Sequence, residues 1–191
     1  MTKPLPLTSD SLKAHFLLAT PALNRGFFAQ SITYICEHTE EGAMGIVVNQ
    51  PLEVAFEEVL GNLDIDYQEG SNQETIFAGG PVQMDHGFIL HREKGNWETS
   101  ESVGNDIWLT TSQDILTAIA AGSGPHSHLI ALGYAGWGPG QLEEELMENS
   151  WLTIKADAEI LFDIPYPERL IAAGDKLGID ISLMSSQTGH A

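Results

Sequence analysis

Short runs of β-branched, aromatic and other apolar residues, each closed by glycine or proline, constrain the fold of this chain most. Residues 31–36, SITYIC, are of the types that favour strands. After the glycines of residues 42–45, the run 45–49, GIVVN, predicts a second strand, so the two form a hairpin that ends before Pro51. Further strands are expected at residues 75–78, 87–90, 97–99, 107–110, 128–132 and 151–154, with a turn at Gly79-Gly80-Pro81 between the first two.

Helical spacing of apolar residues recurs mainly in the second half of the chain. We predict helices at residues 54–60, 115–121, 139–147, 158–162 and 167–173. Thr111 and Asp114 predict a capping box before the second of these helices, and Pro139 suits the first turn of the third. The pattern predicts an α+β protein with one compact domain over residues 1–191, of which residues 1–13 form a loosely held arm.

The charge of the chain excludes several kinds of partner. Asp and Glu number 27 against 8 Lys and Arg, a formal net charge of −19. Nucleic acids and anionic membranes are bound through clustered Lys and Arg, so we expect no direct contact with either. The charge keeps a protein soluble, and it also suits a basic protein partner.

The compartment follows from what the sequence lacks. No apolar run approaches the roughly 20 residues of a membrane span, and the patch at residues 14–19 is too short to predict a signal peptide. One cysteine cannot form an internal disulfide, so nothing requires an oxidising compartment. We therefore expect a cytoplasmic protein.

Cys36, Glu37 and His38 bring a thiol, a carboxylate and an imidazole together in sequence. If the strand reaches His38, then Cys36 and His38 share a face, and the imidazole could lower the pKa of the thiol. The amide of Asn49 could orient the ring. The alternative is a buried cysteine, since cysteine is among the most buried residue types, with His38 only beginning the turn.

Two further motifs are weaker. His126 and His128 have the spacing of metal ligands but lack a third partner, so no metal and no cofactor is expected. Glycines 136, 138 and 140 precede a helix but match no phosphate-binding pattern, and the acidic residues 143–145 would repel an anion. A tight turn under Trp137 explains these glycines better.

Several segments together resemble the AlgH/YqgE family of bacterial proteins over nearly the whole chain. The matching segments are residues 16–21, 31–38, 41–45, 77–82, 87–91 and 132–142, with Asn49, Pro51, Glu143, Glu145, Asn149, Trp151, Leu152 and the final Gly-His-Ala. The resemblance implies a branched sheet with a barrel-like part and flanking helices. It supplies no catalytic residue, and one namesake is called a transcriptional regulator of exopolysaccharide synthesis. This chain departs from the family pattern at Thr20, where Met is usual, and at Arg25-Gly26, where Asp-Pro is usual.

Three hypotheses for function follow. The first is a regulatory or interaction protein that acts indirectly, through an unknown protein partner or small ligand, without binding DNA. The second is a thiol-dependent enzyme or redox sensor that uses Cys36, with His38 as base and Asn49 nearby. The third is small-ligand binding by Gly79, Gly80, Gln141 and Asn149.

Overall fold

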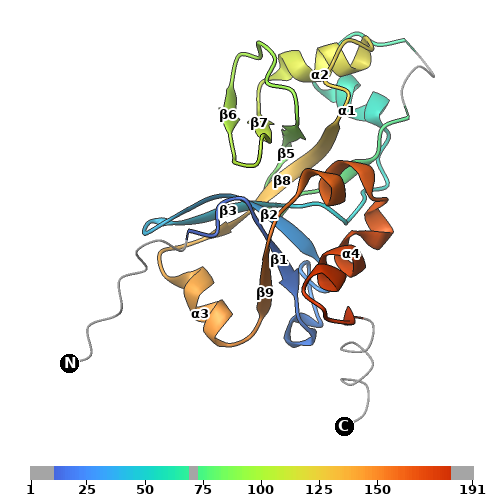
Figure 1. Ribbon diagram of the computed structural model, residues 1–191. Helices are drawn as coiled ribbons and strands as arrows, with labels where there is room; N and C mark the ends of the chain where they lie inside the picture. The colour runs from blue at the N-terminus through green and yellow to red at the C-terminus, as the bar shows by residue number, and fades with distance from the viewer. Residues whose placement is uncertain (1–10, 69–72, 182–191) are drawn as a thin grey trace.

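The computed structural model describes residues 11–68 and 73–181, arranged around one long strand, β8 (Figure 1). The described strands are β1 (His15–Ala19), β2 (Ile32–Thr39), β3 (Gly42–Val47), β4 (Ile76–Ala78), β5 (Val82–His91), β6 (Ser100–Ser102), β7 (Trp108–Thr110), β8 (His128–Trp137) and β9 (Trp151–Lys155). The described α-helices are α1 (Phe56–Asn62), α2 (Gln113–Ala120), α3 (Gln141–Met147) and α4 (Arg169–Lys176). Short 3₁₀ and π turns are η1 (Pro21–Leu23), η2 (Glu159–Asp163) and η3 (Tyr166–Glu168).

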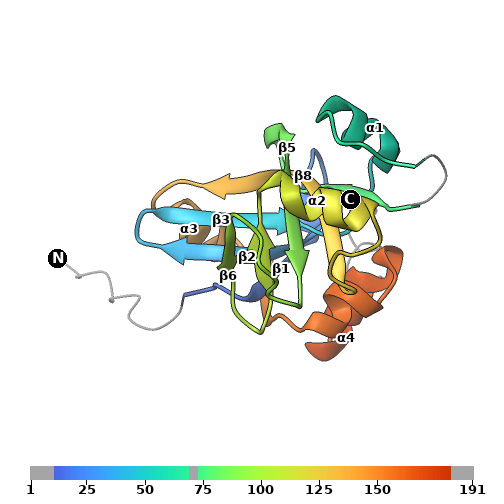
Figure 2. The same ribbon diagram turned by 90° about the horizontal axis from the view of Figure 1, so that it is seen from above.

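β8 joins two parts of the sheet, because different strands pair along its two edges. β5 is antiparallel to it on one edge. On the other edge β4 runs parallel to residues 130–132, and β3 runs antiparallel to residues 135–137. The strand order is β6-β7-β5-β8-β3-β2-β1-β9 with β4 as a branch, and the sheet curls into a half-barrel (Figure 2). The predicted α+β class, with a branched mixed sheet, a barrel-like part and flanking helices, is confirmed.

The described residues form three apolar clusters. The main cluster lies within the curled sheet around Phe16 and Tyr34. Residues 159–176, which comprise η2, η3 and α4 and are called the C-terminal helical segment below, cover this cluster through Leu161. A second cluster packs α1 and α2 against the first half of β8. The third packs α3 against β1, β2 and β9 through Leu142. The helices therefore cover both ends of β8, as Figure 1 shows.

Three strands differ from the sequence prediction. β1 was missed, because residues 15–19 are almost wholly buried on both faces and carry no alternation of polar and apolar residues. β8 continues to Trp137, so the turn predicted at residues 136–140 begins only at Gly138. The strand predicted at residues 97–99 is also wrong, since the pairing segment is Ser100–Ser102.

The predicted capping box before α2 is wrong. The N-cap residue is Ser112, whose hydroxyl bonds to the carboxylate of Asp114 at 2.5 Å. Thr111 instead forms a hydroxyl–hydroxyl hydrogen bond of 2.9 Å with Thr99. The helix thus begins one residue later than the motif indicates, because Thr111 belongs to the loop network beside β6.

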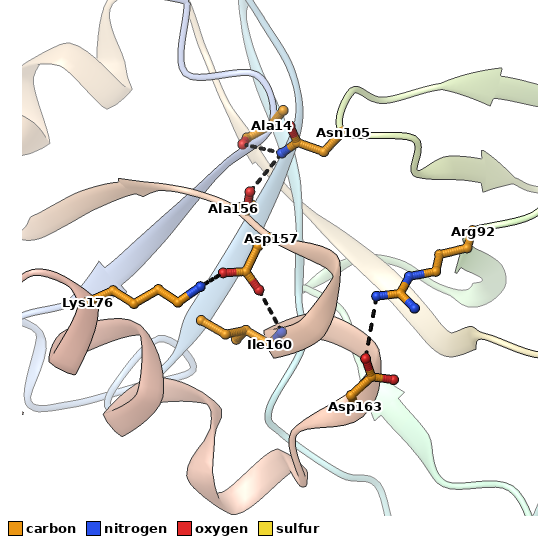
Figure 3. Close-up of polar contacts among 8 residues, drawn as sticks. All are labelled: Ala14, Arg92, Asn105, Ala156, Asp157, Ile160, Asp163 and Lys176. Carbon is orange, nitrogen blue, oxygen red and sulfur yellow. Dashed lines mark hydrogen bonds and ion pairs between the residues drawn. The ribbon is translucent and has the colours of Figure 1, made fainter.

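Two ion pairs hold the C-terminal helical segment (Figure 3). Lys176 of α4 pairs with Asp157, whose carboxylate also accepts the backbone N–H of Ile160 at 2.8 Å. Arg92, just after β5, reaches Asp163 at 3.4 Å. These contacts position η2, η3 and α4 beside the sheet.

The β6–β7 loop bonds to the chain next to Asp157. The amide of Asn105 donates to the carbonyl of Ala14 at 3.2 Å and to that of Ala156 at 2.9 Å (Figure 3). The hydroxyl of Tyr34 donates to the carbonyl of Val103 at 2.7 Å. One loop therefore connects β1, β2 and the chain after β9.

The N-terminal arm is described only in part. Residues 1–10 lie outside the described residues, whereas Ser11 and Leu12 bond to His38 through a hydroxyl and a backbone N–H. Among the described residues, no helix has the length and apolar character needed to cross a membrane.

Candidate functional site

Cys36 lies in the core at a β-bulge. The register between β2 and β3 pairs Ile35 with Gly45 and Glu37 with Met44, so Cys36 has no partner in the ladder. A bulge adds one residue and interrupts the alternation of faces. Cys36 is 3% exposed in the main cluster, and its sulfur lies 4.0 Å from the carbonyl oxygen of Tyr34.

The imidazole of His38 bonds to groups other than the thiol of Cys36. Its Nδ1 accepts the N–H of Leu12 at 2.9 Å, so the ring hydrogen is on Nε2, which donates to Glu143 of α3 at 2.7 Å. Both nitrogens are therefore engaged away from Cys36. The expectation that Cys36 and His38 share a face is wrong, because the bulge reverses the alternation between them.

The surroundings of Cys36 oppose thiolate formation. Burial, and secondarily the negative charge of Glu101, raise the pKa of the thiol well above its ordinary value. A nucleophilic cysteine needs the opposite shift and access to solvent. Neither the position of Cys36 nor that of His38 favours a thiol-dependent enzyme.

We expect Cys36 to react with iodoacetamide at least about a thousandfold more slowly in the native protein than in urea, because labelling requires opening of the core. Mass spectrometry of samples quenched over time measures both rates. His38→Ala should leave the slow native reaction in place. Fast native labelling that slows in His38→Ala would instead show an activated thiol.

Asn49 holds the hairpin together. Its amide nitrogen donates to the carbonyl of Gln30 at 2.9 Å, and its amide oxygen accepts the N–H of Ile32 at 3.1 Å. The side chain thus fixes the start of β2. The structure does not bring it to His38.

Gly79 and Gly80 carry the chain across β8, and they do not form a hairpin turn. β4 and β5 pair with opposite edges of β8, so the segment between them passes directly over Gly133. A Cβ on Gly79 would lie 2.3 Å from the carbonyl oxygen of Gly133, and one on Gly80 would lie 1.9 Å from the carbonyl carbon of Tyr134. The N–H of Gly79 already donates to Leu132, so it is unavailable to an anion.

Gln141 is the first residue of α3, and Asn149 follows the end of this helix. The side chain of Gln141 accepts the N–H of Gly138 at 3.0 Å and donates to Glu145 at 3.3 Å. Asn149 has a positive φ of 58°, and its carbonyl accepts the hydroxyl of Thr20 at 2.7 Å. Neither these two residues nor the two glycines belong to the walls of the cavities at α2, at loop 20–26, or between β4, β8 and the C-terminal helical segment. The structure does not gather these four predicted ligand residues into one site.

Glu145 organises the glycine-rich motif after β8. Its Oε2 accepts the indole N–H of Trp137 at 2.7 Å and that of Trp151 at 3.0 Å. Both rings also contact Phe28, with centroids 6.2 and 5.7 Å away. Sequence reasoning missed this acceptor, although two buried indoles near one run of glutamates are a usable signal. The motif is structural.

One exposed surface combines charge with an apolar side chain. The acidic face consists of Glu40 and Glu41 at the hairpin tip and Glu144, Met147 and Glu148 at α3. All five are exposed, and Met147 is 83% exposed. The hairpin and α3 lie side by side in Figures 1 and 2. This face suits a basic surface with an apolar contact.

The histidine pair is not arranged as a metal site. The two ring nitrogens of His128 lie 3.0 Å from Glu74 and 2.7 Å from the carbonyl of Pro125. Within residues 11–68 and 73–181, no three His, Cys, Asp or Glu side chains are grouped to hold a metal ion.

Thr20 holds the start of loop 20–26 in place. Thr20 is buried, and its hydroxyl donates toward the carbonyls of Asn149 and Ser150 and accepts the N–H of Ala22. It therefore caps η1. Thr20 and Pro21 also line a cavity of about 360 Å³ next to this loop.

Comparison with known proteins identifies the family. A family model described as AlgH-like matches residues 16–182. The chain belongs to the AlgH-like family. The UPF0301 protein of Saccharophagus degradans is 51% identical over 181 residues, which cover 95% of this chain and 89% of that protein. That of Nitrosococcus oceani is 48% identical over 178 residues, or 93% and 95% of the two chains.

Two solved structures resemble this AlgH-like chain. The solution structure of AlgH from Pseudomonas aeruginosa has a TM-score of 0.80 and 47% identity, and it covers each chain completely. The crystal structure of DIP2367 from Corynebacterium diphtheriae has a TM-score of 0.72, 18% identity and 92% coverage of each chain. The second similarity concerns the fold alone.

Proposed function

We propose that this AlgH-like chain is a cytoplasmic regulatory protein that acts through a basic protein partner and does not itself bind DNA. The formal net charge of −19 carries the proposal. Binding to a phosphate backbone requires Lys and Arg that displace counterions, and repulsion by excess carboxylates opposes it at long range.

The positions of the basic side chains support the same conclusion. Four of the eight Lys and Arg residues are engaged by the protein itself. Arg92 and Lys176 pair with carboxylates, Lys94 lies 5.4 Å from the ring centre of Trp108, and Arg169 is buried. These four do not form a surface that follows a nucleic acid strand.

The acidic face is the surface that fits the partner best. Its carboxylates attract a basic surface, and Met147 offers an adaptable apolar contact that such a surface can cover. We expect association there to be steered by charge and therefore to weaken as salt increases.

An environment-sensitive fluorophore on Met147→Cys tests the proposal, because buried Cys36 leaves the new thiol as the labelled one. We expect a lysine-rich peptide to change its signal at low salt and to lose the effect at high salt, while duplex DNA changes nothing. The same label on Ile171→Cys of α4, where Ile171 is 50% exposed, is the matched control and should respond to neither.

Two results would contradict the proposal. Tight, sequence-specific DNA binding at physiological salt would remove the indirect mode of action. An equal peptide response at positions 147 and 171 would mean general attraction to a negative protein, with no docking face.

A further inference from the structure

Arg169 is a buried charge held by neutral groups. It is 8% exposed, and it is the one Lys, Arg, Asp or Glu among the buried described residues. Its Nε donates to the carbonyl of Ile164 at 3.0 Å and its Nη1 to the carbonyl of Val48. Its guanidinium carbon lies 5.3 Å from the ring centre of Phe77. Two carbonyls use two of its five N–H donors.

The charge of Arg169 is not balanced by a carboxylate of the described chain. None of the ion pairs formed among residues 11–68 and 73–181 includes it. Burial lowers the pKa of Arg169 to about 10, so the side chain keeps its charge at neutral pH. A buried charge without an opposite charge is costly, and a bound anion would remove that cost.

Arg169 also lines a cavity of about 570 Å³, a volume typical of small-molecule sites. The cavity lies between the β4–β8 pair and the C-terminal helical segment, and aromatic walls come from Phe77, Phe162 and Tyr166. Phe77 and Tyr166 meet edge to face with ring centres 5.7 Å apart. The walls can therefore contact an apolar or aromatic ligand body.

The other charged groups of the lining are already paired. Asp163 pairs with Arg92, and Glu74 pairs with His128. Burial lowers the pKa of His128, but its hydrogen bonds to Glu74 and to the carbonyl of Pro125 outweigh burial and raise it above the ordinary value. Glu74 and Asp163 each already have a partner, so Arg169 is the charged group of the lining that has no partner of opposite charge among the described residues.

We propose that this cavity binds a small carboxylate-bearing organic anion, whose carboxylate pairs with Arg169 and whose apolar body lies against Phe77 and Tyr166. A guanidinium matches a planar carboxylate through parallel N–H donors. A single guanidinium suits a monoanion, while a phosphate dianion would meet the carboxylates of Glu74 and Asp163. The cavity contains none of the residues of the acidic face, so the tests of this proposal do not depend on the proposed protein partner.

Benzoate, neutral benzamide and phenyl phosphate are suitable probes for the full chain. We expect benzoate to raise the melting temperature in proportion to the logarithm of its concentration, and the other two to have little effect. In ¹H–¹⁵N spectra benzoate should shift the amides of the lining residues Phe77, Leu129, Ile164, Tyr166 and Arg169. Equal effects of benzoate and benzamide, or benzoate shifts confined to other residues, would overturn the proposal.

Arg169→Met should weaken benzoate binding about tenfold or more, whereas Arg25→Met, which removes an exposed charge outside the lining, should leave it nearly unchanged. Because Arg169 also binds two carbonyls, its variant risks unfolding. Thr75→Trp at the exposed rim provides a second variant, since it fills the cavity and leaves Arg169 intact. A folded Arg169→Met, or Thr75→Trp, that binds benzoate as well as the natural chain would contradict the assignment.

Discussion

Gly80→Ala should destabilise the protein by about 3 kcal/mol or more, which corresponds to a fall of roughly 6–12 °C in melting temperature for a chain of this size. The added Cβ would lie 1.9 Å from the carbonyl carbon of Tyr134 and 2.0 Å from its oxygen. Both atoms belong to the backbone of β8, which pairs with strands on both edges. A flexible side chain could move aside, but the centre of the sheet cannot.

Gly61→Ala is the matched control for that substitution. Gly61 lies within α1, and no atom comes within 4 Å of the position that an added Cβ would take. Alanine there should stabilise the protein by about 0.5–1 kcal/mol, because glycine loses more backbone entropy in a helix. Urea unfolding of both variants, followed by circular dichroism, compares them. A Gly80→Ala protein as stable as the natural chain would show that the crossing over β8 has room for a side chain.

Residue propensities and the positions of glycine correctly predicted the elements that depend on residues close in sequence. The β2–β3 hairpin, the strand at residues 75–78 and α2 all follow from strand or helix formers next to glycine. The same rules gave the wrong path for Gly79-Gly80-Pro81. Glycine and proline indicate a turn, yet these glycines are required by contact with Gly133, which lies more than fifty residues later. A single sequence does not contain that contact.

The prediction that Cys36 and His38 lie on one face was wrong for a related reason. The shared face of Cys36 and His38 depends on uninterrupted alternation, and the bulge that interrupts it is set by pairing with β3. Nothing within residues 34–38 marks the bulge. The Glu143 partner of His38 lies 105 residues away.

The burial of Arg169 also could not be predicted from the residues next to it in sequence. In sequence it follows Pro167 and Glu168, as expected for an exposed residue in the first turn of a helix. Its burial results from Val48, which lies 121 residues earlier. The cavity beside it combines β4, the start of β8 and the C-terminal segment, so it exists only in the folded chain.

Glu145→Ala should destabilise the protein by about 2–4 kcal/mol, because it leaves the indole N–H groups of Trp137 and Trp151 without their acceptor. The two residues are 6% and 4% exposed, so water is a poor substitute. We expect the near-ultraviolet circular dichroism of these rings to weaken as their packing against Phe28 loosens. Urea unfolding followed by tryptophan fluorescence measures the stability.

Glu144→Ala is the matched control, since Glu144 is the exposed neighbour in the same helix and alanine is a good helix former. It should change stability by less than about 0.5 kcal/mol. Glu145→Gln separates charge from hydrogen bonding. Its amide oxygen can still accept an indole N–H, but its NH₂ group would face the donor of Gln141, so we expect an intermediate loss. If Glu145→Ala were as mild as Glu144→Ala, the glycine-rich motif would have to be retained for a reason other than this network, and α3 would become a stronger candidate for direct contact with a partner.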